Sequence, residues 1–306
     1  MVQPDEPRAD GRLSSRGVTI IVPAYNEEKG ICGVVERLSA LDLGVPTEIL
    51  VVDDGSTDAT TQRLRELEPS VPGLRVIRQE VNRGYGAALK IGFARAVHEV
   101  IVITDADGTY PEDRIVDLIA CVDDGADMAV GARRGEDVHI PLVRRPAKAL
   151  LGLLASYLAG ERIPDLNSGL RAFRRGFVQT YRPILPQGFS FTTTSTLAAL
   201  TNHHRVDYVS INYAHRKGSS KIRPIRDTLG FLSLIVRTVL YFNPLKVFYP
   251  VAGVLFLAFL GSLVYDVFIS SSEFGLGDKT VLLFVAFLQI MGIGLLADLI
   301  EKRSRL

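Results

Sequence analysis

The stretch Ile101-Val-Ile-Thr-Asp105-Ala-Asp107-Gly108-Thr-Tyr-Pro111 decides how the rest of the chain is interpreted. Its four apolar or β-branched residues predict a short buried strand, and Gly108 predicts that a turn follows. Asp105 and Asp107 would then lie at the carboxyl edge of a sheet, where open α/β folds bind ligands. Two neighbouring carboxylates repel each other unless a cation lies between them, and a divalent cation that also binds substrate phosphates would meet that need. The alternative is a solvated acidic turn.

Composition sets the broad class of the protein. The chain has 306 residues, of which 47% are hydrophobic, so it can bury a full core and exceeds one average domain. Its 35 Lys and Arg residues nearly balance its 34 Asp and Glu residues, and we therefore expect no nucleic acid partner. Cys32 and Cys121 lack ligand-like spacing, which indicates small buried residues in a reducing compartment. Residues 1–16 lack the apolar segment of a signal peptide, and we expect a disordered tail.

Strands and helices alternate through the first half of the chain. Apolar runs predict five strands, at residues 18–22, 47–52, 74–77, 100–104 and 128–131. Helical spacing predicts a helix through Ile31 and Leu38, a second that Ser56 or Thr57 caps, and a third that ends at Val97. This alternation predicts an α/β fold with a mostly parallel, Rossmann-like sheet and helices on both faces.

Four polar clusters follow the predicted strands and should share one edge of the sheet. They occupy residues 22–28, 53–58, 82–90 and 105–111. Asp53 and Asp54 could bind a ribose or base, or only cap a turn. Gly84 and Gly86 could let backbone N–H groups approach a phosphate, although an ordinary turn has the same pattern. No P-loop is present and no G-x-G-x-x-G follows the first strand, which disfavours a dinucleotide-binding dehydrogenase.

In this order and spacing, the four clusters resemble the family-2 glycosyltransferases of the GT-A fold, over about residues 18–225. Asp105-Ala106-Asp107 is similar to the metal-binding D-x-D of that family. The resemblance implies a Mg²⁺ or Mn²⁺ ion held by Asp107, with Asp105 and Thr109 as further candidate ligands. Thr109 stands where the mannose synthases have glutamine, and it is the weaker ligand. The resemblance also implies that the nucleotide-binding residues are Pro23, Tyr25, Glu27, Asp53, Asp54, Gly84, Lys90, Asp105, Ala106, Arg216 and Lys221.

The second half of the chain narrows the resemblance to the polyprenyl-phosphate sugar synthases, which include the dolichol-phosphate mannose and glucose synthases. Residues 165–171, Asp-Leu-Asn-Ser-Gly-Leu-Arg, are similar to their D-x-x-S-G-x-R segment, and residues 216–221 to their R-x-G-x-S-K segment. Arginine suits bidentate phosphate binding. We expect the acceptor phosphate to contact Arg133, Arg144, Arg145, Ser168 and Arg171. The predicted catalytic residues are Asp105, Asp107, Arg133 and Asp165, the last of which would orient Arg171 or an acceptor oxygen.

Hydrophobicity is concentrated near the C-terminus. Residues 250–269 and 281–300 each have the length of about 20 residues that a membrane-spanning helix needs, the alternative being buried soluble helices. Asp266, in the first segment, should face the second segment or the interface. Basic residues flank the pair, so the positive-inside rule predicts that the catalytic domain and both termini are cytoplasmic. Residues 222–245 predict basic amphipathic helices that lie on the membrane surface or pack against the soluble domain.

These predictions combine into one membrane enzyme. Its parts are a tail (1–16), a GT-A catalytic domain (17–221), juxtamembrane helices (222–245) and two transmembrane helices within residues 246–306. The predicted reaction is the inverting, metal-dependent transfer of one sugar from a nucleotide diphosphate sugar to polyprenyl phosphate. The motif Asp-Gly-Thr-Tyr-Pro and the run Phe-Thr-Thr-Thr-Ser-Thr at 191–196 favour UDP-glucose or UDP-GlcNAc over GDP-mannose.

Several alternatives stay open. The chain has no tryptophan, which argues against the processive synthases that carry Q-x-x-R-W. Another lipid acceptor, such as diacylglycerol or ceramide, would not need the arginine cluster. A non-catalytic membrane scaffold would be free to lose Asp105 and Asp107, and both are present. A homo-oligomer is also possible.

Overall fold

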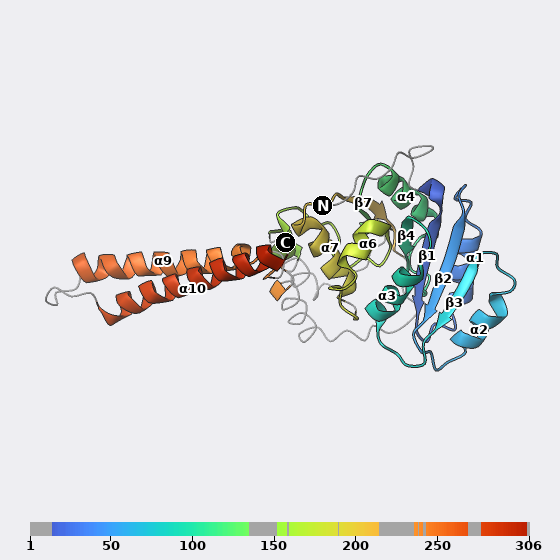
Figure 1. The fold of residues 1–306 in the computed structure, drawn as a ribbon, viewed down its shortest axis with the longest axis horizontal. Coiled ribbons are helices and arrows are strands. Elements are labelled where there is room, and N and C mark those ends of the chain that lie inside the picture. Colours follow the sequence, from blue (N-terminus) through green and yellow to red (C-terminus); the bar gives the residue numbers. More distant parts are fainter. Residues whose placement is uncertain are drawn as a thin grey trace.

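The computed structural model describes residues 14–134, 152–157, 159–188, 190–213, 236–237, 239–240, 243–268 and 277–304. The predicted tail and most of the predicted juxtamembrane segment lie outside these ranges. The described residues form an α/β domain and a long helical hairpin that extends away from it (Figure 1).

A seven-stranded sheet, in the order β3-β2-β1-β4-β6-β5-β7, forms the centre of the α/β domain. Its strands are β1 (Val18–Ala24), β2 (Thr47–Asp53), β3 (Leu74–Arg78), β4 (Val100–Ile103), β5 (Met128–Arg133), β6 (Arg171–Arg174) and β7 (Val206–Ile211). Among the described strands, β6 alone runs antiparallel to its neighbours, between β4 and β5. The other pairs are parallel, so the carboxyl ends of β1, β2, β4 and β5 meet at one edge.

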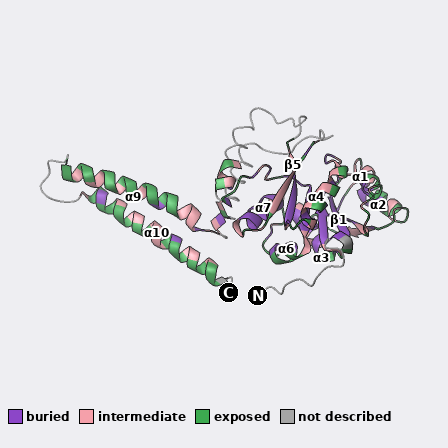
Figure 2. Cartoon of the chain, turned by 90° about the horizontal axis from the view of Figure 1, so that it is seen from above, coloured by how far each residue is buried: buried purple, intermediate pink, exposed green. Residues whose placement is uncertain are grey.

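Helices cover both faces of the sheet. One face packs against α1 (Ile31–Ser39), α2 (Thr60–Leu67) and α4 (Ile115–Asp123), and the other against α3 (Tyr85–Arg95), α6 (Arg175–Tyr181) and α7 (Phe191–Thr201). Side chains alternate between these two cores along each strand, so Ile20 belongs to the first and Ile21 to the second. Figure 2 shows the buried strands enclosed between the two helical layers. The predicted α/β architecture is confirmed.

The local predictions succeed where an apolar run is continuous. All five predicted strands form, with ends that differ by one or two residues. The helix after β2 begins at Thr60 rather than after Ser56, because the backbone N–H of Ser56 bonds to Asp53 inside a turn. Helix α3 ends at Arg95, short of the predicted Val97. The two cysteines are free and half-buried rather than fully buried.

Strands β6 and β7 were not among the predicted elements. The sequence of β6 is Arg-Ala-Phe-Arg, which lacks the apolar run that identifies a strand. Its partners β4 and β5 lie far away in sequence, so only long-range packing places β6 between them.

Two long apolar helices, α9 (Leu245–Phe268) and α10 (Asp278–Ser304), form the hairpin. Both are long and apolar enough to cross a membrane, and only 6% and 11% of their most apolar windows are buried (Figure 2). Such exposure is unlike that of core helices in a soluble protein. Asp266 of α9 accepts hydrogen bonds from the Gly277 backbone N–H and the Thr280 hydroxyl, at 2.9 and 2.6 Å. It therefore faces the second helix, as the sequence predicts.

A small apolar cluster joins the α/β domain to the hairpin. It contains Ala155, Ala159, Ile163, Leu197, Leu200 and Val239, with the partly buried Val247 packed against it. Two of these residues belong to α7 and one to α9. Helix α7 therefore lies between the sheet and the start of the hairpin (Figure 1).

Candidate active site

Hydrogen bonds connect the turn after β1 to the turn after β2. Asn26 adopts a left-handed backbone conformation with φ of 56°, and its side-chain oxygen accepts a bond from the Thr57 backbone N–H at 2.8 Å. The Asn26 backbone N–H donates in turn to the Ser56 hydroxyl at 3.0 Å. These bonds hold the turn beside Tyr25, whose ring is 42% exposed at the sheet edge.

The two acids after β2 organise the backbone around them. Asp53 is fully buried, and its carboxylate accepts bonds from the Ser56 backbone N–H at 2.9 Å and the Thr61 hydroxyl at 2.5 Å. Asp54 is 2% exposed and accepts three bonds, from the backbone N–H groups of Arg83 and Gly84 and the side-chain amide of Gln79. Both acids shape the neighbouring loops, and their contact with a nucleotide stays a prediction.

The loop before α7 covers the start of α3. A Cβ at Gly84 would lie 2.9 Å from the carbonyl oxygen of Gln187, and one at Gly86 would lie 2.3 Å from that of Pro186. The Ala87 backbone N–H donates to the Gln187 carbonyl at 2.9 Å. The two glycines therefore allow two backbone segments to approach each other closely. Nucleotide binding by Gly84 stays a prediction.

Lys90 lies on α3, beyond this covered start. Its ammonium group is 3.5 Å from the carbonyl oxygen of Pro183, and burial lowers its pKa. It lines a groove with Arg182 rather than meeting the acids after β4. A nucleotide contact by Lys90 likewise stays a prediction.

Asp105 and Asp107 follow β4 at the same edge, and both are partly exposed. The Tyr85 hydroxyl donates to one oxygen of Asp105 at 3.1 Å. Thr109 donates to one oxygen of Asp107 through both its backbone N–H and its hydroxyl, at 3.1 and 2.6 Å. Burial, reinforced by the Asp105 charge, raises the pKa of Tyr85 well above its ordinary value. The tyrosine therefore remains protonated and able to donate.

The donor groups at this edge fit a metal that shares its shell with a substrate. The described residues contain no cluster of three or more His, Cys, Asp or Glu side chains able to hold a metal. Two carboxylates are nevertheless sufficient for Mg²⁺, which often completes its shell with water and substrate phosphates. Thr109 is 2% exposed and points its hydroxyl at Asp107. In this structure it orients a candidate ligand.

Arg133, at the end of β5, forms a buried ion pair with Asp165. The guanidinium Nε and Nη2 donate to the two carboxylate oxygens at 2.7 and 2.9 Å, and the Arg133 backbone N–H adds a bond of 3.1 Å. Burial alone would lower the pKa of Arg133, but the hydrogen bonds to Asp165 outweigh it and raise that pKa above its ordinary value. The sequence predicts that Asp165 orients Arg171 or an acceptor oxygen. In the structure it orients Arg133.

Arg171 and Ser168 are fully buried. The Arg171 guanidinium donates to the carbonyl oxygens of Leu166 and Ser168, at 3.0 and 2.8 Å. It also bonds to the hydroxyls of Ser195 and Thr196 on α7, at 3.2 and 2.7 Å. Burial lowers the pKa of Arg171. Arg171 therefore braces the 165–170 loop against α7, and the contact of Arg171 and Ser168 with an acceptor phosphate stays a prediction.

Most of the predicted site residues converge on one edge of the sheet. They are Pro23, Tyr25, Glu27, Asp53, Asp54, Asp105, Ala106, Asp107, Thr109, Arg133 and Asp165. Four others, Arg144, Arg145, Arg216 and Lys221, lie outside the described residues.

Sequence reasoning missed the roles of Tyr85, Tyr110 and Gly169. Tyr110 is 4% exposed, and its hydroxyl accepts a 2.6 Å bond from the Gly169 backbone N–H. The ring of Tyr110 also packs edge-on against Tyr213, over which the Arg133 guanidinium lies. All three residues lie inside motifs identified in the sequence, at residues 82–90, 105–111 and 165–171. Their position in these motifs is the one feature of the sequence that could have indicated a role.

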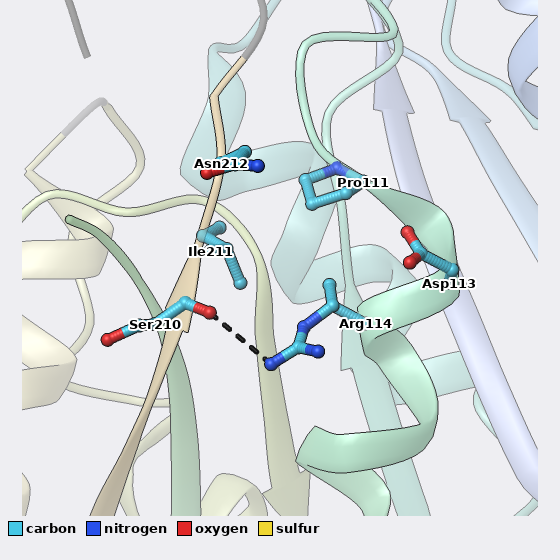
Figure 3. Close-up of a pocket in the computed structure, with 6 residues that line it drawn as sticks. All are labelled: Pro111, Asp113, Arg114, Ser210, Ile211 and Asn212. Carbon is cyan, nitrogen blue, oxygen red and sulfur yellow. Dashed lines mark hydrogen bonds between the residues drawn. The ribbon is translucent and has the colours of Figure 1, made fainter. Parts of the chain in front are cut away.

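A separate cavity of about 320 Å³ opens between the 3₁₀ turn Glu112–Arg114 and the end of β7 (Figure 3). It is lined by Pro111, Asp113, Arg114, Ser210, Ile211 and Asn212. The Arg114 guanidinium reaches across to the Ser210 carbonyl oxygen at 3.4 Å, as the dashed line in Figure 3 shows. None of the lining residues is a predicted site residue, and we assign the cavity no catalytic role.

Comparison with known proteins places the chain in a family. Residues 19–182 match the family model of glycosyl transferase family 2, and residues 243–302 match that of the GtrB C-terminal hairpin. The chain belongs to glycosyl transferase family 2. Its hairpin is of the type found in GtrB. The predicted resemblance is thereby confirmed.

Curated relatives include proteins named undecaprenyl-phosphate 4-deoxy-4-formamido-L-arabinose transferase. That of Pectobacterium carotovorum is 31% identical over 191 residues, and the alignment spans 58% of this chain and 58% of the relative. That of Yersinia enterocolitica is 28% identical over 308 residues, which cover 93% and 88% of the two chains.

A solved structure shares the fold. The glucosyl-3-phosphoglycerate synthase of Mycobacterium tuberculosis, in complex with Mn²⁺, UDP and glucosyl-3-phosphoglycerate, superposes with a TM-score of 0.57 at 24% identity. The match covers 78% of this chain and 85% of that one.

Proposed function

We propose that this protein transfers one sugar from a UDP-sugar to a polyprenyl phosphate at a membrane surface. The observation that carries the proposal is the convergence of Asp105, Asp107, Tyr25 and Arg133 on one sheet edge, in a chain that continues into an apolar hairpin. The relatives named undecaprenyl-phosphate transferases support the lipid phosphate. The fold neighbour that holds UDP and Mn²⁺ is consistent with the donor.

The donor side would bind the nucleotide between the turns after β1, β2 and β4. The exposed Tyr25 ring offers a face on which a base can stack. Asp105 and Asp107 would hold Mg²⁺ or Mn²⁺, which when bound compensates the charge on the leaving diphosphate. Arg216 and Lys221 would close over the diphosphate from the second half of the chain.

The acceptor side would orient a group that is already ionised at neutral pH. An oxygen of the lipid phosphate attacks the anomeric carbon while the bond from that carbon to the diphosphate breaks. The diphosphate leaves with the bonding electrons, and the configuration at the anomeric carbon inverts. No strong base is needed, so catalysis would rest on orientation and electrostatics. Arg133, which Asp165 holds in place, would compensate charge together with Arg144 and Arg145.

The hairpin would hold this site beside the lipid. Helices α9 and α10 would span the membrane, with the catalytic domain and both termini on the cytoplasmic side. Lys302 and Arg303, in the last turn of α10, agree with that orientation because basic residues favour the cytoplasmic face. The predicted homo-oligomer stays a prediction.

A transfer assay with the purified full chain in detergent tests the proposal. Radiolabelled UDP-glucose, UDP-GlcNAc, GDP-mannose and the UDP-linked form of the relatives' 4-formamido-arabinose are offered with undecaprenyl phosphate or diacylglycerol, in Mn²⁺, Mg²⁺ or EDTA. We expect a labelled polyprenyl-phosphate sugar that requires a UDP-sugar and a metal. Product only on diacylglycerol would replace the acceptor, and product only from GDP-mannose would replace the donor. No product from any pair would overturn the proposal in favour of a scaffold.

A further inference from the structure

The Asp105 carboxylate lies between two groups from distant parts of the chain. On one side, the Tyr85 hydroxyl donates to its Oδ1 at 3.1 Å. On the other side, Gly169 packs so closely that a Cβ there would lie 2.9 Å from both carboxylate oxygens and 3.1 Å from Cγ. Real Cβ atoms essentially never come within 3.0 Å of a heavy atom outside their own residue and its chain neighbours. A side chain at position 169 would therefore have to displace the carboxylate or the loop that carries it.

Both neighbours of Asp105 are themselves held in place. Tyr85 packs against the core between the sheet and α3. The backbone N–H of Gly169 donates to the buried Tyr110 hydroxyl at 2.6 Å, and Arg171 holds the carbonyl of the preceding Ser168 at 2.8 Å. A displacement of either neighbour would disturb a packed region, so the two act as a rigid clamp.

We propose that Tyr85 and Gly169 are positioning residues for the metal-binding acid Asp105. The Tyr85 hydroxyl engages Oδ1, and the absence of a side chain at Gly169 leaves the space that the carboxylate occupies, so together they determine how the acid is oriented toward a divalent cation. This inference rests on the proposed function, in which Asp105 and Asp107 hold the metal. Groups that orient metal ligands change metal affinity by about 10- to 100-fold when they are replaced.

The loop that carries Gly169 also serves the acceptor side. Asp165, in the same loop, pairs with Arg133, and the Asn167 backbone N–H bonds to the same carboxylate at 3.1 Å. One braced segment therefore supports both the acceptor-side cation and the metal-side acid.

Mn²⁺ binding by the full chain in detergent, with UDP present, tests the clamp without any turnover. The loss of the free Mn²⁺ signal in electron paramagnetic resonance measures the affinity. We expect Gly169→Ala to weaken Mn²⁺ binding by about 10- to 100-fold, and Tyr85→Phe by about 10-fold. Gly176→Ala is the matched control, because it is exposed on α6 and nothing lies within 4 Å of a Cβ there. Circular dichroism melting verifies that each variant is folded.

The double variant separates a clamp from two independent effects. Without the Tyr85 hydroxyl, the carboxylate can move away from the new methyl group at position 169. The combined loss in Tyr85→Phe with Gly169→Ala should therefore be smaller than the product of the single losses. Losses that simply multiply, or wild-type affinity in Gly169→Ala, would overturn the clamp and leave the proposed function intact. Should Gly169→Ala not fold, wild-type affinity in Tyr85→Phe, which keeps the ring, would overturn it.

One result would contradict the proposed function as well as the clamp. If the wild-type chain with UDP binds no Mn²⁺, the metal site fails and the inference fails with it. The two failures are thus distinguished by the wild-type measurement alone.

Discussion

The two sides of the site hold their charged residues in opposite ways. After β4, Asp105 and Asp107 stay partly exposed and receive hydrogen bonds from the neutral hydroxyls of Tyr85 and Thr109. On the proposed acceptor side, Arg133 meets the carboxylate of Asp165, whose side chain is 3% exposed.

This difference indicates which charged residues bind a ligand and which also stabilise the fold. A hydroxyl donor orients a carboxylate without adding charge, whereas in the Arg133–Asp165 pair two opposite charges meet within the protein. The donor-side acids should therefore matter for chemistry more than for folding. The acceptor-side pair should matter for both, because removing one partner leaves the other charge buried and unpaired.

The largest expected effect is on the donor side. Asp107→Ala should reduce sugar transfer by about 10³-fold, because charge compensation on the leaving diphosphate is lost. The melting temperature should stay near that of the wild type, since Asp107 is partly exposed. Asp113→Ala, which removes an exposed acid nearby, is the control and should retain activity. A variant that transfers sugar normally would end the assignment of Asp107 as a metal ligand.

Substitution of Asp165, on the proposed acceptor side, should lower the stability of the fold. Asp165→Ala leaves Arg133, whose side chain is 18% exposed, without its partner, and should cost about 3–5 kcal/mol of unfolding free energy. The melting temperature should then fall by roughly 10 °C. Because the chain has no tryptophan, circular dichroism in detergent is the suitable measurement. Asp124→Ala breaks an ion pair in which Asp124 is 75% exposed, and it should melt close to the wild type. Equal melting of both variants would contradict the comparison.

The same contrast explains what the sequence could predict. Each donor-side turn follows a continuous apolar run, so its acids could be placed at the sheet edge from local patterns alone. Arg133 and Arg171 look alike in sequence, since both are cations in motif-like stretches. Only the insertion of β6 between β4 and β5 and the packing of α7 make Arg171 fully buried. That burial depends on contacts between distant segments, which single-sequence patterns do not encode.

A smaller effect should distinguish orientation of Asp107 from metal coordination by Thr109. Thr109→Val removes the 2.6 Å hydroxyl bond to Asp107 but keeps the branched shape and the backbone bond of 3.1 Å. We expect about a tenfold loss of Mn²⁺ affinity and a similar loss of transfer. Thr109→Ser, which restores a hydroxyl, should recover most of both. A loss as deep as that of Asp107→Ala would instead indicate direct coordination by Thr109.

The smallest expected effect concerns the pair formed by Asp127 and His204 at the opposite edge of the sheet. Asp127 precedes β5, and its carboxylate contacts the His204 ring at 3.0 Å and the Arg205 backbone N–H at 3.2 Å. The bond to His204 is the main reason that the pKa of Asp127 lies below its ordinary value. The pair therefore stabilises the fold in full above the unfolded pKa of about 3.9, and this contribution is lost as the pH falls through the lower folded pKa.

Asp127→Asn should lower the melting temperature at neutral pH by about 2–4 °C, as expected for one hydrogen bond to a charged group. Sugar transfer should be unchanged, because the pair lies away from the edge that carries Asp105 and Arg133. The gap in melting temperature from the wild type should close as the pH is lowered stepwise from about 3.9 through the lower folded pKa, below which Asp127 is protonated in both states. A gap that stays constant with pH would show that packing, rather than charge, accounts for the loss. A fall in sugar transfer would mean that Asp127, at the far edge of the sheet, also affects the site. Residues that only stabilise the fold could then not be distinguished from residues that bind substrate.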